Sequence, residues 1–153
     1  MEYKPSSTVL ILTICSLNKE PDGEPVYEER NSISSILPKN LSQRLNSTRE
    51  KIRKEITTNP DFSWAGMTLK EIIYNENVVA GKDFSSDKNA LYRPAINRYK
   101  GRFYTGLGKE RSTLVGNSPH HMLILSGLYG LLRPFESIQL YSCPLIRGVK
   151  DTW

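Results

Sequence analysis

The sequence predicts a single α/β domain in which a mostly buried, partly parallel sheet is flanked by helices. Short apolar segments bounded by polar residues occur at 8–15 and 121–126, and both are typical of buried strands. Segments with helical periodicity lie between them, and strands separated by helices favour a sheet with parallel neighbours. The length of 153 residues fits one domain, 1–153, with a core of its own.

The remaining elements follow from apolar spacing and from helix signals. Segment 41–56 has leucine and isoleucine on one helical face, so it predicts an amphipathic surface helix. Its basic residues are expected on a solvated outer face, namely Arg44, Arg49, Lys51, Arg53 and Lys54. Thr68 and Glu71 have the spacing of a capping box, which predicts a helix start.

Two further segments complete the predicted fold. Segment 85–101 is expected to be helical, with Pro94 at a kink or in the first turn of a new helix. Gly101 is placed to end that helix. Segment 137–143 is predicted to be a third strand.

Composition and motifs exclude several classes of function. With 38% hydrophobic and 24% charged residues the chain is globular, and no apolar stretch approaches the ~20 residues of a membrane helix. Cys15 and Cys143 are expected to be free thiols in a reducing, cytoplasmic setting. His120 and His121 are adjacent and point to opposite sides of a strand, so no metal site is predicted. No cofactor fingerprint or serine-nucleophile motif is present, which leaves catalysis undecided.

Two polar segments follow the predicted parallel strands, where ligands bind in open α/β sheets. They are 16–19 and 126–130, and we expect them side by side. Glycine permits close backbone approach, and Arg133 could hold a phosphate or carboxylate with its guanidinium fork. Ligand-binding residues are therefore predicted at Ser16, Lys19, Ser126, Gly127, Tyr129, Gly130 and Arg133. A plain tight turn, with Tyr129 packed and Arg133 solvated, is the alternative.

The whole chain has a formal net charge of +5, and its positive charge is concentrated in one segment. Basic residues and tyrosines alternate within 93–111, and Glu110 is the only acid there. Cations neutralise phosphates and aromatic rings stack on bases, so this segment predicts a nucleic-acid surface. The predicted contacts are Arg93, Arg98, Lys100, Arg102, Tyr104, Lys109 and Arg111. A solvated helix face with core aromatics would produce the same pattern.

Two stretches, "YKGRFYTGL" at 99–107 and "LILSGLYGLLRPFESIQLY" at 123–141, resemble a known signature. The bacterial peroxide-stress YaaA family carries "F-K-G-D-V-Y-x-G-L" followed by "R-x-L-S-G-L-Y-G-x-L-R-P-L-D-x-M-Q-P-Y-R". This chain differs at Arg102, where the family has an acid, and at 140–142, where the family has Pro-Tyr-Arg. Family chains also continue beyond the tryptophan that Trp153 resembles, so the chain is expected to be a divergent member or the N-terminal part of a longer one.

The resemblance implies a cytoplasmic stress-response protein that binds double-stranded DNA through a basic cleft and limits peroxide and iron damage. A second, weaker resemblance links 124–145 to a module of archaeal tRNA-guanine transglycosylase and archaeosine-synthesis proteins, with Tyr141 and Pro144 in a "Y-x-x-P" segment. It implies a nucleotide- or nucleobase-binding enzyme domain, and it adds Tyr141 to the predicted ligand-binding residues. The implied partners are duplex DNA, or a nucleotide or phosphate anion.

Overall fold

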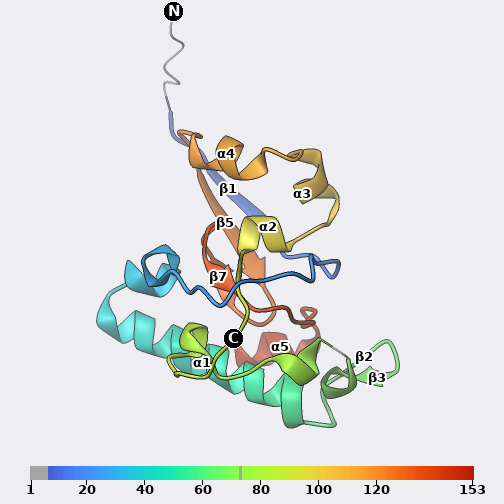
Figure 1. Ribbon diagram of the computed structural model, residues 1–153. Coiled ribbons are helices and arrows are strands. Elements are labelled where there is room, and N and C mark those ends of the chain that lie inside the picture. The colour runs from blue at the N-terminus through green and yellow to red at the C-terminus, as the bar shows by residue number, and fades with distance from the viewer. Residues whose placement is uncertain (1–6, 73) are drawn as a thin grey trace, which may run out of the picture.

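The computed structural model describes residues 7–72 and 74–153 and shows helices around a mixed sheet (Figure 1). Strand β1 (Leu10–Ile14) pairs in parallel with β5 (His121–Ser126). Strand β5 continues through a tight turn into β6 (Gly130–Leu132), which pairs with it in antiparallel orientation. The predicted α/β class and the parallel pairing of the two apolar strands are therefore confirmed.

Strand β1 lies at the edge of the sheet, whose order is β1-β5-β6, and none of its residues is buried, so the prediction of a buried strand over 8–15 is wrong in its burial. Its alternate side chains Leu10, Leu12 and Ile14 are more than half exposed, because the period-two geometry of a strand points them away from the core. In β5, by contrast, Ile124 is fully buried. The core lies between this central strand and the helix α1.

Helix α1 (Lys39–Thr58) confirms the helix predicted over 41–56. Ile52 and Ile56 are fully buried, as the spacing indicated. Arg49 lies on the same face, because it precedes them by three and seven residues. It is 1% exposed, so its prediction as a solvated residue is wrong.

The helix predicted over 85–101 is wrong except for one short turn. Helix α2 (Ala95–Arg98) is preceded by β4 (Arg93–Pro94), which pairs with β7 (Ser137–Ile138). Proline lacks an N–H and disfavours helical geometry in the residue before it, so the helix begins only after Pro94. Gly101 precedes helix α3 (Arg102–Gly106) instead of ending a longer one.

The third predicted strand, 137–143, is shortened to β7 and lies outside the sheet formed by β1, β5 and β6. The capping box between Thr68 and Glu71 is present, but it begins only the 3-10 turn η3 (Leu69–Glu71). The other elements are η1 (Glu29–Asn31), η2 (Ile33–Ser35), β2 (Ser63–Trp64), β3 (Met67–Thr68), η4 (Asn75–Asn77), η5 (Lys82–Phe84), α4 (Arg111–Gly116) and α5 (Arg147–Thr152).

Figure 1 places α1 and α5 at one end of the molecule and α3 and α4 at the other, with the sheet between them. The predicted site segments leave the strands in the middle of this arrangement. Within 7–72 and 74–153, no helix is long and apolar enough to cross a membrane.

Candidate functional site

The carboxyl ends of β1 and β5 lie next to each other. The last registered pair is Ile14 with Leu125, and the Cys15 N–H donates to the Leu125 carbonyl at 2.8 Å. Ser126, the last residue of β5, and Ser16, just beyond β1, therefore lie at the same end of neighbouring strands. The predicted juxtaposition of the two polar segments is confirmed at this point.

The segment after β1 is held by a second pairing. Lys19 forms an antiparallel bridge with Tyr99, and the Lys100 N–H donates to the Asn18 carbonyl at 2.9 Å. This pairing turns the Lys19 side chain inward, where the residue is only 7% exposed. Segment 99–107, which carries part of the family signature, therefore pairs with the loop that follows β1.

Lys19, Tyr99, Tyr141 and Ser126 form a buried group that we call the lysine cluster. The Lys19 Nζ lies 4.4 Å from the ring centre of Tyr141 and 5.5 Å from that of Tyr99. The Tyr141 hydroxyl is hydrogen-bonded to the Ser126 Oγ at 2.6 Å and to the Tyr99 hydroxyl at 2.7 Å. Three of the four residues were predicted as ligand-binding residues, and Tyr99 is the addition.

The amine of Lys19 has an unusual environment. It donates to the Ser16 carbonyl at 2.6 Å, and no carboxylate of the described residues lies within ion-pair distance. Burial lowers the pKa of Lys19 to about 8. Burial also raises the pKa of the Cys143 thiol to about 12 and holds the pKa of both tyrosines well above the usual value, so these groups are neutral.

Lys19 opens onto a small hollow of about 280 Å³, which we call the lysine pocket. The hollow is lined by Leu17, Asn18, Lys19, Tyr74 and Lys100. It lies at the carboxyl end of β1, where sequence reasoning expected a ligand. The arrangement places a buried lysine of lowered pKa in the wall of a hollow.

The turn that joins β5 to β6 has a packing explanation for both glycines. A side chain at Gly127 would overlap the Cys143 carbonyl, and one at Gly130 would overlap the Trp153 ring. Gly130 also has a φ of +66°, which favours glycine. The Trp153 indole N–H donates to the Gly127 carbonyl at 2.9 Å. An anion-binding role for this turn stays a prediction.

The Arg133 guanidinium and the Tyr129 hydroxyl find their hydrogen-bond partners outside the lysine cluster. The Arg133 Nη1 donates to the Arg30 carbonyl at 3.0 Å, and the Tyr129 hydroxyl donates to Asp83 at 2.7 Å. Tyr129 still contacts the cluster, because its N–H donates to the Ser126 Oγ at 3.1 Å and its ring packs edge-on against that of Tyr141, with ring centres 5.4 Å apart. The structure therefore divides the eight predicted ligand-binding residues between two regions.

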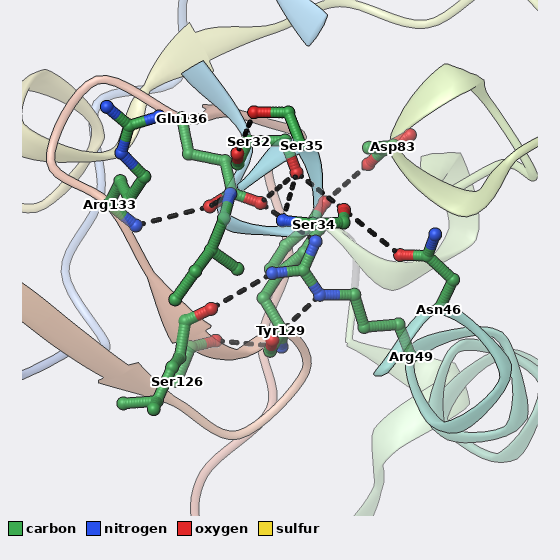
Figure 2. A network of polar contacts seen from close by, with 12 residues as sticks. Ser32, Ser34, Ser35, Asn46, Arg49, Asp83, Ser126, Tyr129, Arg133 and Glu136 are labelled. Carbon is green, nitrogen blue, oxygen red and sulfur yellow. Dashed lines mark hydrogen bonds and ion pairs between the residues drawn. The ribbon is translucent and has the colours of Figure 1, made fainter. Parts of the chain in front are cut away.

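A buried ion pair, which the sequence did not indicate, supports the second region. Figure 2 shows Arg49 between Glu136 and Tyr129. The Arg49 guanidinium pairs with Glu136 at 2.8 Å and donates to the carbonyls of Tyr129 and Leu131 at 2.8 and 3.0 Å. Glu136 also accepts from the N–H groups of Ile33 and Arg133. The one available signal was the position of Arg49 on the apolar face of its helix.

Asp83 is the second buried acid of this region. It accepts hydrogen bonds from Tyr129, Tyr92 and Gln139. Burial nevertheless outweighs these bonds and raises the pKa of Asp83 from 3.8 to about 6.

We expect Asp83 to make the wild-type protein less stable as pH rises from 4 to 7. Because its folded pKa is raised, the folded state holds the proton more tightly than the unfolded state, and this advantage is lost as pH passes through about 6. Relative to Asp83→Asn, the free energy of unfolding should fall by about 2–3 kcal/mol over this range, at ~1.4 kcal/mol per pKa unit. Urea unfolding of both proteins at several pH values measures this difference. A constant or widening advantage of the wild type would contradict the assignment.

A second hollow of about 520 Å³, which we call the basic groove, lies beside the lysine pocket. Its cationic side chains come from Arg93, Lys100, Lys109 and Arg111, and its other lining residues are Glu20, Asn97, Thr105, Gly108 and Ser112. Lys100 lines both hollows, so the groove and the pocket adjoin at this residue.

The cations of the groove differ in how freely they can move. Arg111 donates to the carbonyls of Tyr99 and Asn97 at 3.1 and 3.3 Å, which holds its guanidinium in place. Lys100 lies 3.5 Å from Glu20, and Arg93 lies 3.8 Å from Asp22. Lys109, in the lining, and Arg102, on the helix α3 that supplies the lining residue Thr105, are exposed and have no ion-pair partner among the described residues.

Two predicted nucleic-acid contacts are corrected by their burial. Arg98 is fully buried and donates to the carbonyls of Glu20, Asp22 and Ile138, so its charge organises the loop after β1. Tyr104 is 1% exposed and donates to the Ile14 carbonyl at 2.6 Å. Its ring is therefore not available for stacking on a base.

The donor atoms needed for a metal site do not converge in the part of the chain that the structure describes. No group of three or more histidine, cysteine, aspartate or glutamate side chains there is arranged to hold an ion. Cys15 and Cys143 are free thiols, as expected.

The fold and the two adjoining hollows define an α/β protein with a buried lysine beside a basic groove. Comparison with known proteins then identifies the family, because residues 17–151 match the one described as "Peroxide stress protein YaaA". The chain belongs to this family, as the signature at 99–141 indicated.

Relatives agree with this assignment. A "UPF0246 protein" of Francisella tularensis subsp. novicida is 26% identical over 150 residues, which cover 92% of this chain and 54% of the relative. A "UPF0246 protein" of Shewanella sediminis is 42% identical over 64 residues, which cover 39% of this chain and 23% of the relative. The chain thus spans about half the length of the Francisella relative.

Proposed function

We propose that this protein acts in the peroxide-stress response of the cytoplasm by binding double-stranded DNA in the basic groove, where it limits damage by iron and peroxide. The observation that carries the proposal is the groove itself, which gathers four cations around a hollow of about 520 Å³. Cations in such a groove neutralise DNA phosphates and release counterions, and this contribution does not depend on the base sequence.

The uncharged residues that line the groove also favour polar contacts with DNA. Asn97, Thr105 and Ser112 line the same groove, and such side chains donate hydrogen bonds to phosphate oxygens. Phe103 on helix α3 is 40% exposed, but no aromatic residue is among the described residues that line the groove. Binding is therefore expected to rest on phosphates and to show no preference between sequences.

Replacing Lys100, Arg102 and Lys109 together with alanine is expected to weaken duplex binding at least about tenfold, equivalent to ~1.4 kcal/mol. All three side chains are exposed, so the fold should be retained. Fluorescence anisotropy with a labelled duplex at low salt measures the change. The loss should be similar for duplexes of unrelated sequence, because phosphate contacts carry no base information.

A matched control removes the same charge from another surface. Arg44, Lys51 and Lys54 are exposed on α1, and their replacement with alanine also removes three positive charges. If net charge alone drives binding, the two triple variants will lose affinity equally. An equal loss would contradict the groove as the binding surface, as would wild-type protein that fails to bind at tens of micromolar.

The alternative function, a nucleotide- or nucleobase-binding enzyme domain, has a specific observation in its favour. Lys19 is a buried amine at the edge of a hollow, and such groups are typical of reactive sites. The two functions are compatible, because the lysine pocket adjoins the basic groove at Lys100.

A further inference from the structure

Lys19 is the one buried lysine of the residues that the structure describes. Its amine has a carbonyl and two aromatic rings as neighbours, whereas buried ammonium groups in proteins are ordinarily paired with an anion. Lys19 also lines a hollow, so the residue lies between the buried cluster and solvent. A desolvated lysine in contact with a pocket is the usual arrangement of a lysine that attacks carbonyl carbons.

We propose that Lys19 is a nucleophile that forms an imine with the aldehyde of a ring-opened abasic deoxyribose in DNA. The inference rests on the proposed function, since DNA lying in the basic groove would bring the sugar to the lysine pocket. It goes beyond that function by adding a covalent reaction and a damaged substrate.

The size of the pocket favours a sugar without its base. At about 280 Å³ the hollow lies just below the ~300–1,000 Å³ typical of small-molecule sites. Leu17 and Tyr74 offer apolar contact to the carbon skeleton, and Asn18 offers a donor and an acceptor to a hydroxyl. Lys100, shared with the basic groove, can hold the phosphate next to the sugar.

Formation of the imine needs only the amine, the aldehyde and one proton. The lone pair of the neutral Lys19 amine attacks the aldehyde carbon, and the C=O π pair moves to oxygen and takes up a proton. The resulting carbinolamine loses its hydroxyl as water, and the nitrogen becomes a protonated imine. Overall, an amine, an aldehyde and one proton yield an iminium ion and one water.

The surroundings of Lys19 suit both the amine and the product. With a pKa of about 8, roughly a quarter of the amine is neutral at pH 7.5, whereas an ordinary lysine is almost wholly charged. The positively charged iminium would remain against the rings of Tyr141 and Tyr99, which attract cations. The titratable and charged groups around the amine are Cys15, Cys143, Arg98, Lys100, Tyr99 and Tyr141.

Reductive trapping tests the inference directly. The full chain is incubated with sodium cyanoborohydride and a duplex containing one abasic site, an intact duplex, or 2-deoxyribose 5-phosphate. Hydride addition converts the iminium to a stable secondary amine, which peptide mass mapping then locates. We expect an adduct on Lys19 with the abasic duplex and with the sugar phosphate, and none with the intact duplex. Lys19→Arg keeps the charge and should reduce trapping at least tenfold.

The possible outcomes separate this inference from the proposed function. Binding of intact duplex without any adduct on Lys19 would overturn the inference and leave DNA binding in place. Trapping of the sugar phosphate at Lys19 without trapping of abasic duplex would overturn DNA as the substrate. Adducts spread over surface lysines, and unchanged in Lys19→Arg, would show that the pocket has no special reactivity and also overturn it.

Discussion

Replacing Arg49 with alanine is expected to destabilise the protein by about 3–5 kcal/mol, a large part of the stability of a domain of this size. The change leaves the Glu136 carboxylate buried without its cation, and it removes donors from the carbonyls of Tyr129 and Leu131. The loss of a partner costs more than the pair contributes, because the remaining charge stays desolvated. The midpoint of urea unfolding, at unchanged m-value, measures the effect.

Arg53 is a matched control on the same helix. It also pairs with a glutamate, Glu50, at 2.6 Å, but that carboxylate is partly exposed. Arg53→Ala should therefore cost about 1 kcal/mol or less. Similar losses in the free energy of unfolding at Arg49 and Arg53 would show that the buried network of Figure 2 contributes no more to stability than a partly exposed ion pair.

Replacing Gly127 with alanine is expected to cost about 3 kcal/mol or more, or to prevent folding. The new methyl group would overlap the backbone carbonyl of Cys143, and a backbone group cannot move aside as the end of a flexible side chain can. The shift would also disturb the Trp153 hydrogen bond to the Gly127 carbonyl. Thermal unfolding followed by circular dichroism measures the loss.

Gly106, at the end of α3, is the control for this substitution. An added Cβ there meets no atom within 4 Å, so Gly106→Ala should leave the melting temperature nearly unchanged or raise it slightly. If Gly127→Ala is equally harmless, the close approach to Cys143 does not explain this glycine. Anion binding by the turn would then be the remaining explanation for Gly127.

The sequence predicted the strands of the fold better than its short helices. The apolar runs at 8–15 and 121–126 were recognisable because β-branched and other apolar residues bounded by polar ones are typical of strands. The sequence did not show that β1 lies at the edge of the sheet, with Leu10, Leu12 and Ile14 exposed. The helix predicted over 85–101 is wrong because Pro94 breaks the helical period and because Tyr92 and Arg93 pair by backbone contacts with residues far along the chain. Such tertiary pairing leaves no periodic signal.

The sequence predicted which candidate residues lie near one another where strand order alone decides, and it failed where burial decides. Ser16, Lys19 and Ser126 follow parallel strands, so topology was enough to bring them together. The burial of Lys19 against Tyr99 depends on a bridge between two loops, which no local pattern shows. Arg98 and Tyr104 looked like surface contacts because charge and aromaticity do not reveal which face of a short helix is covered.

The salt dependence of duplex binding is the most direct test of the basic groove as a DNA-binding surface. For wild-type protein, the logarithm of the association constant should fall linearly with the logarithm of salt concentration, with a slope of about −0.9 per phosphate contact. In the variant lacking Lys100, Arg102 and Lys109 the slope should be less steep by about 2–3, whereas the α1 variant should keep the wild-type slope. Identical slopes for all three proteins would contradict the assignment of phosphate contacts to the groove.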